Sequence, residues 1–237
     1  MSSLSDVSIS VMRHPYHNKR SIFDERDLVA KEPYAQFQKW FEEVCKTNGI
    51  MEPNAMTVAT ATKEGKPSVR PVLMKGFDKN GFVFYTNYGS RKAKELEENP
   101  NCCLMFYWEP LKRAVRIEGR AERISQEESL KYFHSRPRES QLGAIVSQQS
   151  TVISSREVLD KKLAALQEKY ADESIPIPKP DYWGGYLIVP DSFEFWQGQT
   201  NRLHDRLRFR RPVTGEVLDP ELTKVADDGW LLERLAP

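Results

Sequence analysis

The chain has 237 residues, 39% of them hydrophobic and 29% charged, which is typical of a globular protein with one compact domain. Its 35 lysines and arginines balance 34 acidic residues, for a formal net charge of +1. This balance argues against a general nucleic-acid-binding or membrane-surface role, since both need a basic excess. No segment approaches the roughly 20 consecutive apolar residues of a membrane span.

The N-terminal residues, cysteines and histidines bear on compartment and metal binding. Residues 1–10 lack the charged start and apolar run of a secretory signal, so we expect a cytoplasmic protein with reduced thiols. The cysteines show no metal-ligand spacing, and they are Cys45, Cys102 and Cys103. Among the four histidines only His14 and His17 lie close together, and a surface role is favoured over zinc. We therefore expect no metal site.

The first part of the chain predicts an arm followed by a helix and strands. Residues 1–30 show no sustained periodicity and predict a flexible arm, whereas residues 31–237 predict a single domain. The spacing of apolar residues predicts an amphipathic helix over Pro33–Cys45. Alternation then predicts three strands, Met56–Thr62, Ser68–Phe77 and Phe82–Thr86, the last two joined by a hairpin turn at Asn80-Gly81.

The rest of the chain predicts further hairpins with helices outside them. Ser90 predicts the cap of a basic helix over Arg91–Glu98, and capping boxes at Ser125 and Ser154 predict helices that end near His134 and Tyr170. A proline-rich connector, Ile175–Pro180, follows. The remaining strands are expected at Cys102–Trp108, Arg113–Ile124, Tyr186–Trp196, Leu207–Arg211 and Trp230–Leu235. This pattern predicts an α+β, mainly β fold, a small β-barrel with peripheral helices.

Two clusters of cationic and aromatic residues suit anions. The run Tyr85–Lys92 leads from a strand end into a helix start, where backbone N–H groups and two cations form a phosphate cradle. Basic residues in a first helical turn oppose the helix dipole, so an anion site is favoured over a solvated turn. Tyr132, Arg136 and Ser140 follow at four-residue spacing and suit a phosphate monoester. The alternative is a helix end decorated with cations, since Pro137 is expected to end that helix.

Other stretches leave alternatives open. Strand alternation places Arg70 and Lys75 on opposite faces unless a bulge intervenes, so they are either solvated charges or part of a site. The run Phe195–Arg206 concentrates aromatic rings, amides and arginines, which suits a planar anionic ligand. No dinucleotide fingerprint, Walker-type loop or Gly-x-Ser-x-Gly elbow occurs.

These stretches occur together, and in this order, in the pyridoxine (pyridoxamine) 5′-phosphate oxidase family, which the chain resembles from about Arg13 to Pro237. The segments that carry the resemblance are Phe106–Pro110, Tyr132–Pro137, Trp183–Tyr186, Phe195–Arg206 and Trp230–Pro237. The resemblance implies an FMN-binding split β-barrel with peripheral helices that works as a homodimer, with flavin in clefts between the subunits.

The resemblance also implies residue roles. The residues implied as FMN contacts are Arg70, Pro71, Val72, Leu73, Tyr85, Thr86, Arg91, Lys92, Gln149, Ser150, Trp196 and Arg206. The residues implied as substrate contacts are Lys75, Tyr132, Arg136, Ser140, Arg202, Leu203 and His204, together with an N-terminal segment, Arg13, His14, Pro15 and Tyr16, that closes over the site. Arg202 and His204 are implied as the catalytic pair at the pyridine ring.

The implied reaction is oxidation of pyridoxine 5′-phosphate or pyridoxamine 5′-phosphate to pyridoxal 5′-phosphate, with O₂ reduced to hydrogen peroxide. Two alternatives remain: an FMN split-barrel oxidase with another substrate, and a non-catalytic carrier of flavin or pyridoxal phosphate. One departure bears on the cofactor. Ala114 stands where the family commonly carries a glutamine, and alanine has no side-chain hydrogen bond to offer the flavin ring.

Overall fold

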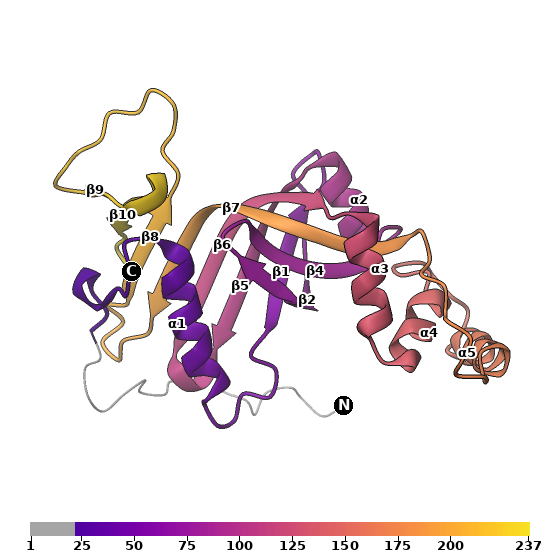
Figure 1. Ribbon diagram of the computed structural model, residues 1–237. Coiled ribbons are helices and arrows are strands. Elements are labelled where there is room, and N and C mark those ends of the chain that lie inside the picture. The colour runs from indigo at the N-terminus through magenta and orange to yellow at the C-terminus, as the bar shows by residue number, and fades with distance from the viewer. Residues whose placement is uncertain (1–21) are drawn as a thin grey trace, which may run out of the picture. The chain divides into compact units, whose positions relative to one another are not determined.

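The computed structural model describes residues 22–237 (Figure 1). Most of the predicted arm, including Arg13, His14, Pro15 and Tyr16, lies outside the described residues. The described residues form two compact units, a terminal unit (residues 22–51, 107–115 and 194–237) and a central unit (residues 52–106 and 116–193). The single domain over 31–237 stays a prediction. No helix in residues 22–237 is long and apolar enough to cross a bilayer.

The central unit is built on an antiparallel sheet. Its strand order is β2-β1-β5-β6-β7, with β4 paired to β7 and β3 paired to β4. The bounds are β1 Ala55–Ala61, β2 Pro67–Leu73, β3 Gly76–Asp78, β4 Gly81–Asn87, β5 Asn101–Trp108, β6 Arg113–Arg123 and β7 Trp183–Gln197. Residues 107–108, 113–115 and 194–197 of β5, β6 and β7 belong to the terminal unit. The alternating burial of β1 and β5 gives the sheet one covered face, as their sequences predicted.

The single strand predicted over Ser68–Phe77 was wrong, because the chain changes its partner there. Up to Leu73 the strand pairs with β1, and from Gly76 it pairs with β4. In between, the amide of Met74 donates to Asn54 O (2.9 Å) and the amide of Lys75 donates to Val83 O (2.8 Å). β2 therefore lies at one end of the strand order, which accommodates two residues without an amide N–H, Pro67 and Pro71.

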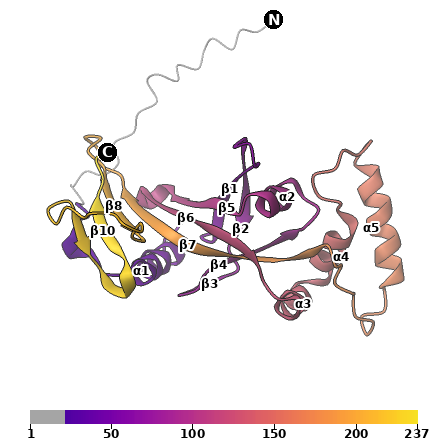
Figure 2. The same ribbon diagram turned by 90° about the horizontal axis from the view of Figure 1, so that it is seen from above.

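Helices α3 (Gln126–Ser135), α4 (Arg138–Val146) and α5 (Glu157–Lys169) gather at one end of the central unit, where α4 and α5 lie side by side (Figure 2). The capping box at Ser125 is confirmed. The box predicted at Ser154 was wrong: α5 starts at Glu157 after a helical Arg156, whose side chain pairs with Asp160 instead (3.0 Å). Sequence reasoning ended the helix at Pro137 and missed α4, which Pro137 begins as the N-cap.

The connector between α5 and β7 is fastened to these helices. Ile177 is buried in a cluster with Phe133, Leu142 and Trp183, against which Leu163 and Leu166 of α5 also pack. His134 Nε2 forms a hydrogen bond with Ile177 O (3.0 Å), and Arg138 donates to backbone carbonyls of Tyr170 and Ile175. The connector thus supports the helices that carry Tyr132, Arg136 and Ser140.

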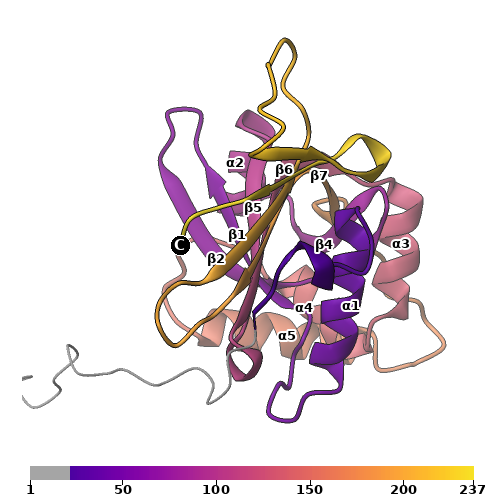
Figure 3. The same cartoon turned by 90° about the vertical axis from the view of Figure 1, so that its left-hand side faces the viewer.

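In the terminal unit, α1 (Pro33–Cys45) packs through its buried residues Phe37, Trp40 and Val44. The Trp40 ring contacts the Phe195 ring edge-on, with 5.4 Å between the centroids. Strands β8 (Asp205–Arg210), β10 (Leu231–Arg234) and β9 (Thr223–Val225) form antiparallel pairs. The short β9 was not predicted. Figure 3 shows the loop over residues 211–222 projecting beyond β8 and β10.

Candidate active site

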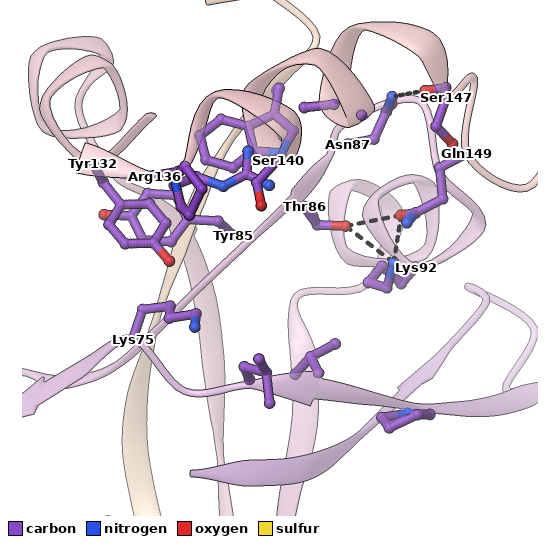
Figure 4. A pocket seen from close by; sticks show the side chains of 17 residues that line it. Lys75, Tyr85, Thr86, Asn87, Lys92, Tyr132, Arg136, Ser140, Ser147 and Gln149 are labelled. Atoms are coloured by element: carbon purple, nitrogen blue, oxygen red, sulfur yellow. Dashed lines mark hydrogen bonds between the residues drawn. The ribbon is translucent and has the colours of Figure 1, made fainter. Parts of the chain in front are cut away.

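A cavity of about 590 Å³ opens in the central unit (Figure 4), within the size range of small-molecule sites. It is lined by residues from β2, β4, α2 (Arg91–Glu98), α3, α4 and the start of β7. The sequence-predicted residues that line it are Pro71, Val72, Leu73, Lys75, Tyr85, Thr86, Lys92, Tyr132, Arg136, Ser140 and Gln149. The fold thus gathers most of the predicted FMN and phosphate residues of the central unit into one cavity.

The change of pairing partner between β2 and β3 positions Lys75. Because the chain leaves β1 after Leu73 and joins β4 at Gly76, the end of β2 and Lys75 both reach the cavity. Tyr85 on β4 lies opposite Gly185 on β7, where a Cβ would come within 2.9 Å of the tyrosine ring. Glycine at that position leaves room for the ring.

One side of the cavity holds a buried cation (Figure 4). Lys92 Nζ donates to Thr86 Oγ1 (3.0 Å) and to Gln149 Oε1 (2.8 Å). Burial, with the charge of Arg70, lowers the pKa of Lys92 to about 8. The N-terminus of α2 lies beside it, with Ser90 as the cap and the amide of Arg91 donating to Ser150 Oγ (3.2 Å). The helix dipole and an ammonium group together suit a phosphate.

Behind this side, a buried carboxylate organises two arginines. Glu95, 3% exposed, accepts from Thr60 Oγ1 and Ser68 Oγ (2.5 Å each) and from Arg91 Nε (2.8 Å). Arg70 Nη2 lies 3.4 Å from the same carboxylate. Burial alone would raise the pKa of Glu95, but the hydrogen bonds from Ser68, Thr60 and Arg91 outweigh it and lower that pKa to about 2. Arg70 and Arg91 do not line the cavity and are held at this carboxylate.

The other side of the cavity carries stacked rings and Arg136. Tyr132 stacks on Tyr85 at a centroid distance of 3.9 Å, and Tyr85 stacks on Trp183 at 5.3 Å. The Arg136 guanidinium lies 4.7 Å from the Trp183 ring centroid, and its Nη1 is buried without a hydrogen-bond partner. Burial raises the pKa of Tyr85 to about 12 and also raises that of Tyr132, so both phenols remain protonated donors. Lys75 and Ser140 lie on this side (Figure 4).

The remaining predicted residues, Trp196, Arg202, Leu203, His204 and Arg206, belong to the terminal unit. The amide of Gln199 donates to His204 Nδ1 (2.9 Å). Burial, with the charge of Arg202, lowers the pKa of His204. The imidazole is therefore neutral near pH 7, with its proton on Nε2. Arg206 donates to Glu194 Oε1 and Ala236 O, at 2.6 Å each, and Arg202 adopts a left-handed backbone with φ of 66°.

Sequence reasoning missed several cavity residues. Asn87 donates through Nδ2 to Ser147 O (2.9 Å) and so joins β4 to the end of α4. Trp183 forms part of the cavity wall although its motif was noted only for the family resemblance. No group of three or more His, Cys, Asp or Glu side chains in residues 22–237 is placed to hold a metal ion.

Comparison with known proteins decides the family. Residues 42–170 match the sequence profile described as pyridoxamine 5′-phosphate oxidase, and residues 183–237 match that of the pyridoxine 5′-phosphate oxidase C-terminal dimerisation region. The chain belongs to the pyridoxamine 5′-phosphate oxidase family. It is 54% identical to a pyridoxine/pyridoxamine 5′-phosphate oxidase of Bombyx mori over 231 residues, covering 98% of this chain and 90% of the relative. It is 50% identical to a pyridoxine-5′-phosphate oxidase of Bos taurus, covering 98% and 88%.

Solved structures share the fold. PhzG from Burkholderia lata, determined with tetrahydrophenazine-1-carboxylic acid, has a TM-score of 0.78 and 28% identity over 91% of this chain and 98% of its own. A pyridoxamine 5′-phosphate oxidase-related, FMN-binding protein from Nostoc punctiforme has a TM-score of 0.63 at 14% identity, over 87% and 98%. The predicted α+β, mainly β fold of the split-barrel family is confirmed.

Proposed function

We propose that the protein is an oxidase that converts pyridoxine 5′-phosphate and pyridoxamine 5′-phosphate to pyridoxal 5′-phosphate, with FMN as cofactor and O₂ reduced to hydrogen peroxide. Membership of the family supports the reaction class. The single observation that carries the proposal is the cavity. In it, a cradle at Lys92 and an Arg136 whose Nη1 has no hydrogen-bond partner offer two separate places for phosphate.

The residues at the Lys92 side fit the phosphate of FMN. Lys92, Thr86 and Gln149 supply an ammonium, a hydroxyl and an amide within 3.1 Å of one another, next to the N-terminus of α2. Arg70 and Arg91 add positive charge from behind. When bound, FMN supplies a two-electron acceptor for the substrate carbon and a route for those electrons to O₂.

The residues at the Arg136 side fit the substrate phosphate. Arg136 has an unused guanidinium donor, Tyr132 is a protonated phenol, and Lys75 and Ser140 line the same cavity. These groups would hold a dianion and fix the orientation of the pyridine ring. A different split-barrel oxidase substrate without a phosphate would leave Arg136 Nη1 buried and unsatisfied, which disfavours that alternative.

We propose that Arg202 and His204 contact the pyridine ring and its 3-hydroxyl. A neutral His204 with its proton on Nε2 can donate a hydrogen bond to an oxygen such as that of the 3-hydroxyl. A carrier without catalysis has no need for both residues at the reacting carbon, which disfavours the carrier alternative.

We also propose a homodimer with FMN in clefts between the subunits. The match of residues 183–237 to a dimerisation region supports self-association. The outer face of β2 and β5 adds an apolar surface, with Val69 66% exposed and Met105 39% exposed. A cytoplasmic location is part of the proposal and agrees with three free cysteines, Cys45, Cys102 and Cys103.

The test is aerobic turnover of pyridoxine 5′-phosphate by FMN-reconstituted protein, with pyridoxal 5′-phosphate and peroxide followed together. Equal appearance of both products is the expected result. A yellow, FMN-loaded protein that makes neither product contradicts the proposed substrate, and a protein that takes up no flavin contradicts the cofactor.

A further inference from the structure

The cavity contains an arginine that is held by rings instead of by a carboxylate. The Arg136 guanidinium lies 4.7 Å from the centroid of Trp183 and 5.9 Å from that of Phe133. Within residues 22–237 it has no ion-pair partner, and its Nη1 has no hydrogen-bond partner. The ring faces fix the position of the group and leave its N–H donors unused.

The arginines behind the other side of the cavity are held differently. Arg70 and Arg91 both contact the carboxylate of Glu95, at 3.4 and 2.8 Å. A carboxylate partner occupies donors and offsets part of the charge, whereas an aromatic face attracts the cation without accepting its in-plane N–H groups. Contact with an aromatic face therefore leaves an arginine better able to bind a dianion from solution than an ion pair with a carboxylate does.

The ring that contacts Arg136 is itself fixed. Trp183, 6% exposed at the first position of β7, stacks on Tyr85 at an interplanar angle of 12°, and Tyr85 stacks on Tyr132 at 20°. Trp183 also meets Phe133 edge-on at 5.4 Å. The indole therefore has little freedom, and its position determines where the guanidinium can lie.

We propose that Trp183 is a positioning residue for phosphate recognition, which acts by stacking under the Arg136 guanidinium and holding its donors toward the cavity. This inference rests on the proposed function, because it assigns the Arg136 side to the substrate phosphate. The role assigned to Trp183 is exercised through Arg136, so its loss should weaken binding of the phosphate and leave the chemical step intact.

The test compares Trp183→Leu and Trp183→Phe in FMN-loaded protein. Loss of the ring should raise the KM for pyridoxine 5′-phosphate about tenfold, equivalent to about 1.4 kcal/mol, with kcat unchanged. The Ki of inorganic phosphate as a competitive inhibitor should rise by the same factor. Trp183→Phe keeps a smaller ring and should give an intermediate increase. It also serves as the second variant in case Trp183→Leu folds poorly.

A double-mutant cycle separates positioning from general packing. If Trp183 acts through Arg136, then Trp183→Leu should change the phosphate Ki less than twofold in an Arg136→Ala background. The matched control is Leu130→Ala, which truncates a 43% exposed side chain on α3 that does not line the cavity and should leave KM and Ki unchanged. An equal effect of Trp183→Leu in both backgrounds, or no effect in either, overturns the inference.

Failure of the proposed function has a different signature. If the FMN-loaded wild-type protein does not oxidise pyridoxine 5′-phosphate, the substrate assignment fails. Binding of inorganic phosphate, measured by calorimetry on the same variants, then decides the inference alone. Weakening by Trp183→Leu that disappears in the Arg136→Ala background supports it, and absent or unchanged phosphate binding overturns it.

Discussion

If FMN binds at the Lys92 side of the cavity as proposed, its affinity should depend on pH. Without a ligand, Lys92 has a pKa of about 8, lowered by burial and by Arg70, and its ammonium donates to neutral oxygens of Thr86 and Gln149. A bound phosphate dianion would stabilise the protonated form and raise this pKa. Binding is therefore coupled to proton uptake, and affinity must fall as the pH rises through 8.

The size of the effect follows from the titration curve. If the protonated form alone binds, its fraction falls from about 0.9 at pH 7 to about 0.1 at pH 9, so the Kd for FMN should rise about tenfold. Below pH 7 the Kd should level off until the phosphate itself begins to protonate near pH 6. The phenol of Tyr85 stays protonated over this range, because its pKa is about 12.

The assay is quenching of FMN fluorescence on titration of apoprotein from pH 6.5 to 9.5. The control is Lys92→Met, which should bind FMN more weakly at pH 7 and show no rise in Kd between pH 7 and 9. A wild-type Kd that stays flat across this range, or a Lys92→Met protein with the same slope as wild type, would refute the reasoning.

Four further predictions concern other groups. Glu95→Gln should lower the free energy of unfolding by about 3 kcal/mol at pH 7, because it leaves Arg70 without its buried partner. Since the folded pKa of Glu95 is about 2 against an ordinary 4.5, the contribution is full above pH 4.5 and is lost as the pH falls toward 2. Urea unfolding at several pH values should show that the difference in free energy of unfolding between Glu95→Gln and wild type shrinks from pH 4.5 to pH 2. A difference that stays constant over this range contradicts the assigned role of Glu95. Ala114→Gln should strengthen FMN binding by about 1 kcal/mol. An unchanged Kd for FMN would contradict the hypothesis that position 114 limits the affinity. Lys75→Met should raise the KM for phosphorylated substrate, whereas Arg202→Ala should reduce turnover more than flavin content. An unchanged KM in Lys75→Met argues against its role at the phosphate. Equal losses of turnover and flavin content in Arg202→Ala argue against its role at the pyridine ring.

Local patterns predicted much of the fold. The apolar spacing in α1, the Ser90 cap of α2 and the Ser125 capping box all depend on residues within one or two turns, and all three are confirmed. The break between β2 and β3 was not predictable in this way, because it depends on a change of partner from β1 to β4. Alternation in the sequence reports which face a residue lies on and carries no information about which strand it pairs with.

The candidate site was predictable in its parts and not in its arrangement. Residue types and the family resemblance singled out Lys75, Lys92, Tyr132 and Arg136, and the structure places all four around one cavity. The contact of Trp183 with Arg136 was not predictable from the sequence. A tryptophan at the start of a strand is an ordinary core residue, and the fold alone places it beside Arg136 at the end of α3. The roles of these residues stay predictions until the variants are measured.

The two prolines of β2 bear on solubility. β2 pairs only with β1 among the described strands, so its other edge is open to any extended chain that could add to it. Pro67 and Pro71 lie four positions apart in the strand, so both remove an amide donor from the same edge. The open edge of β2 is therefore a poor template for the addition of another strand. This should limit aggregation of a newly made chain while the apolar Val69 is still uncovered.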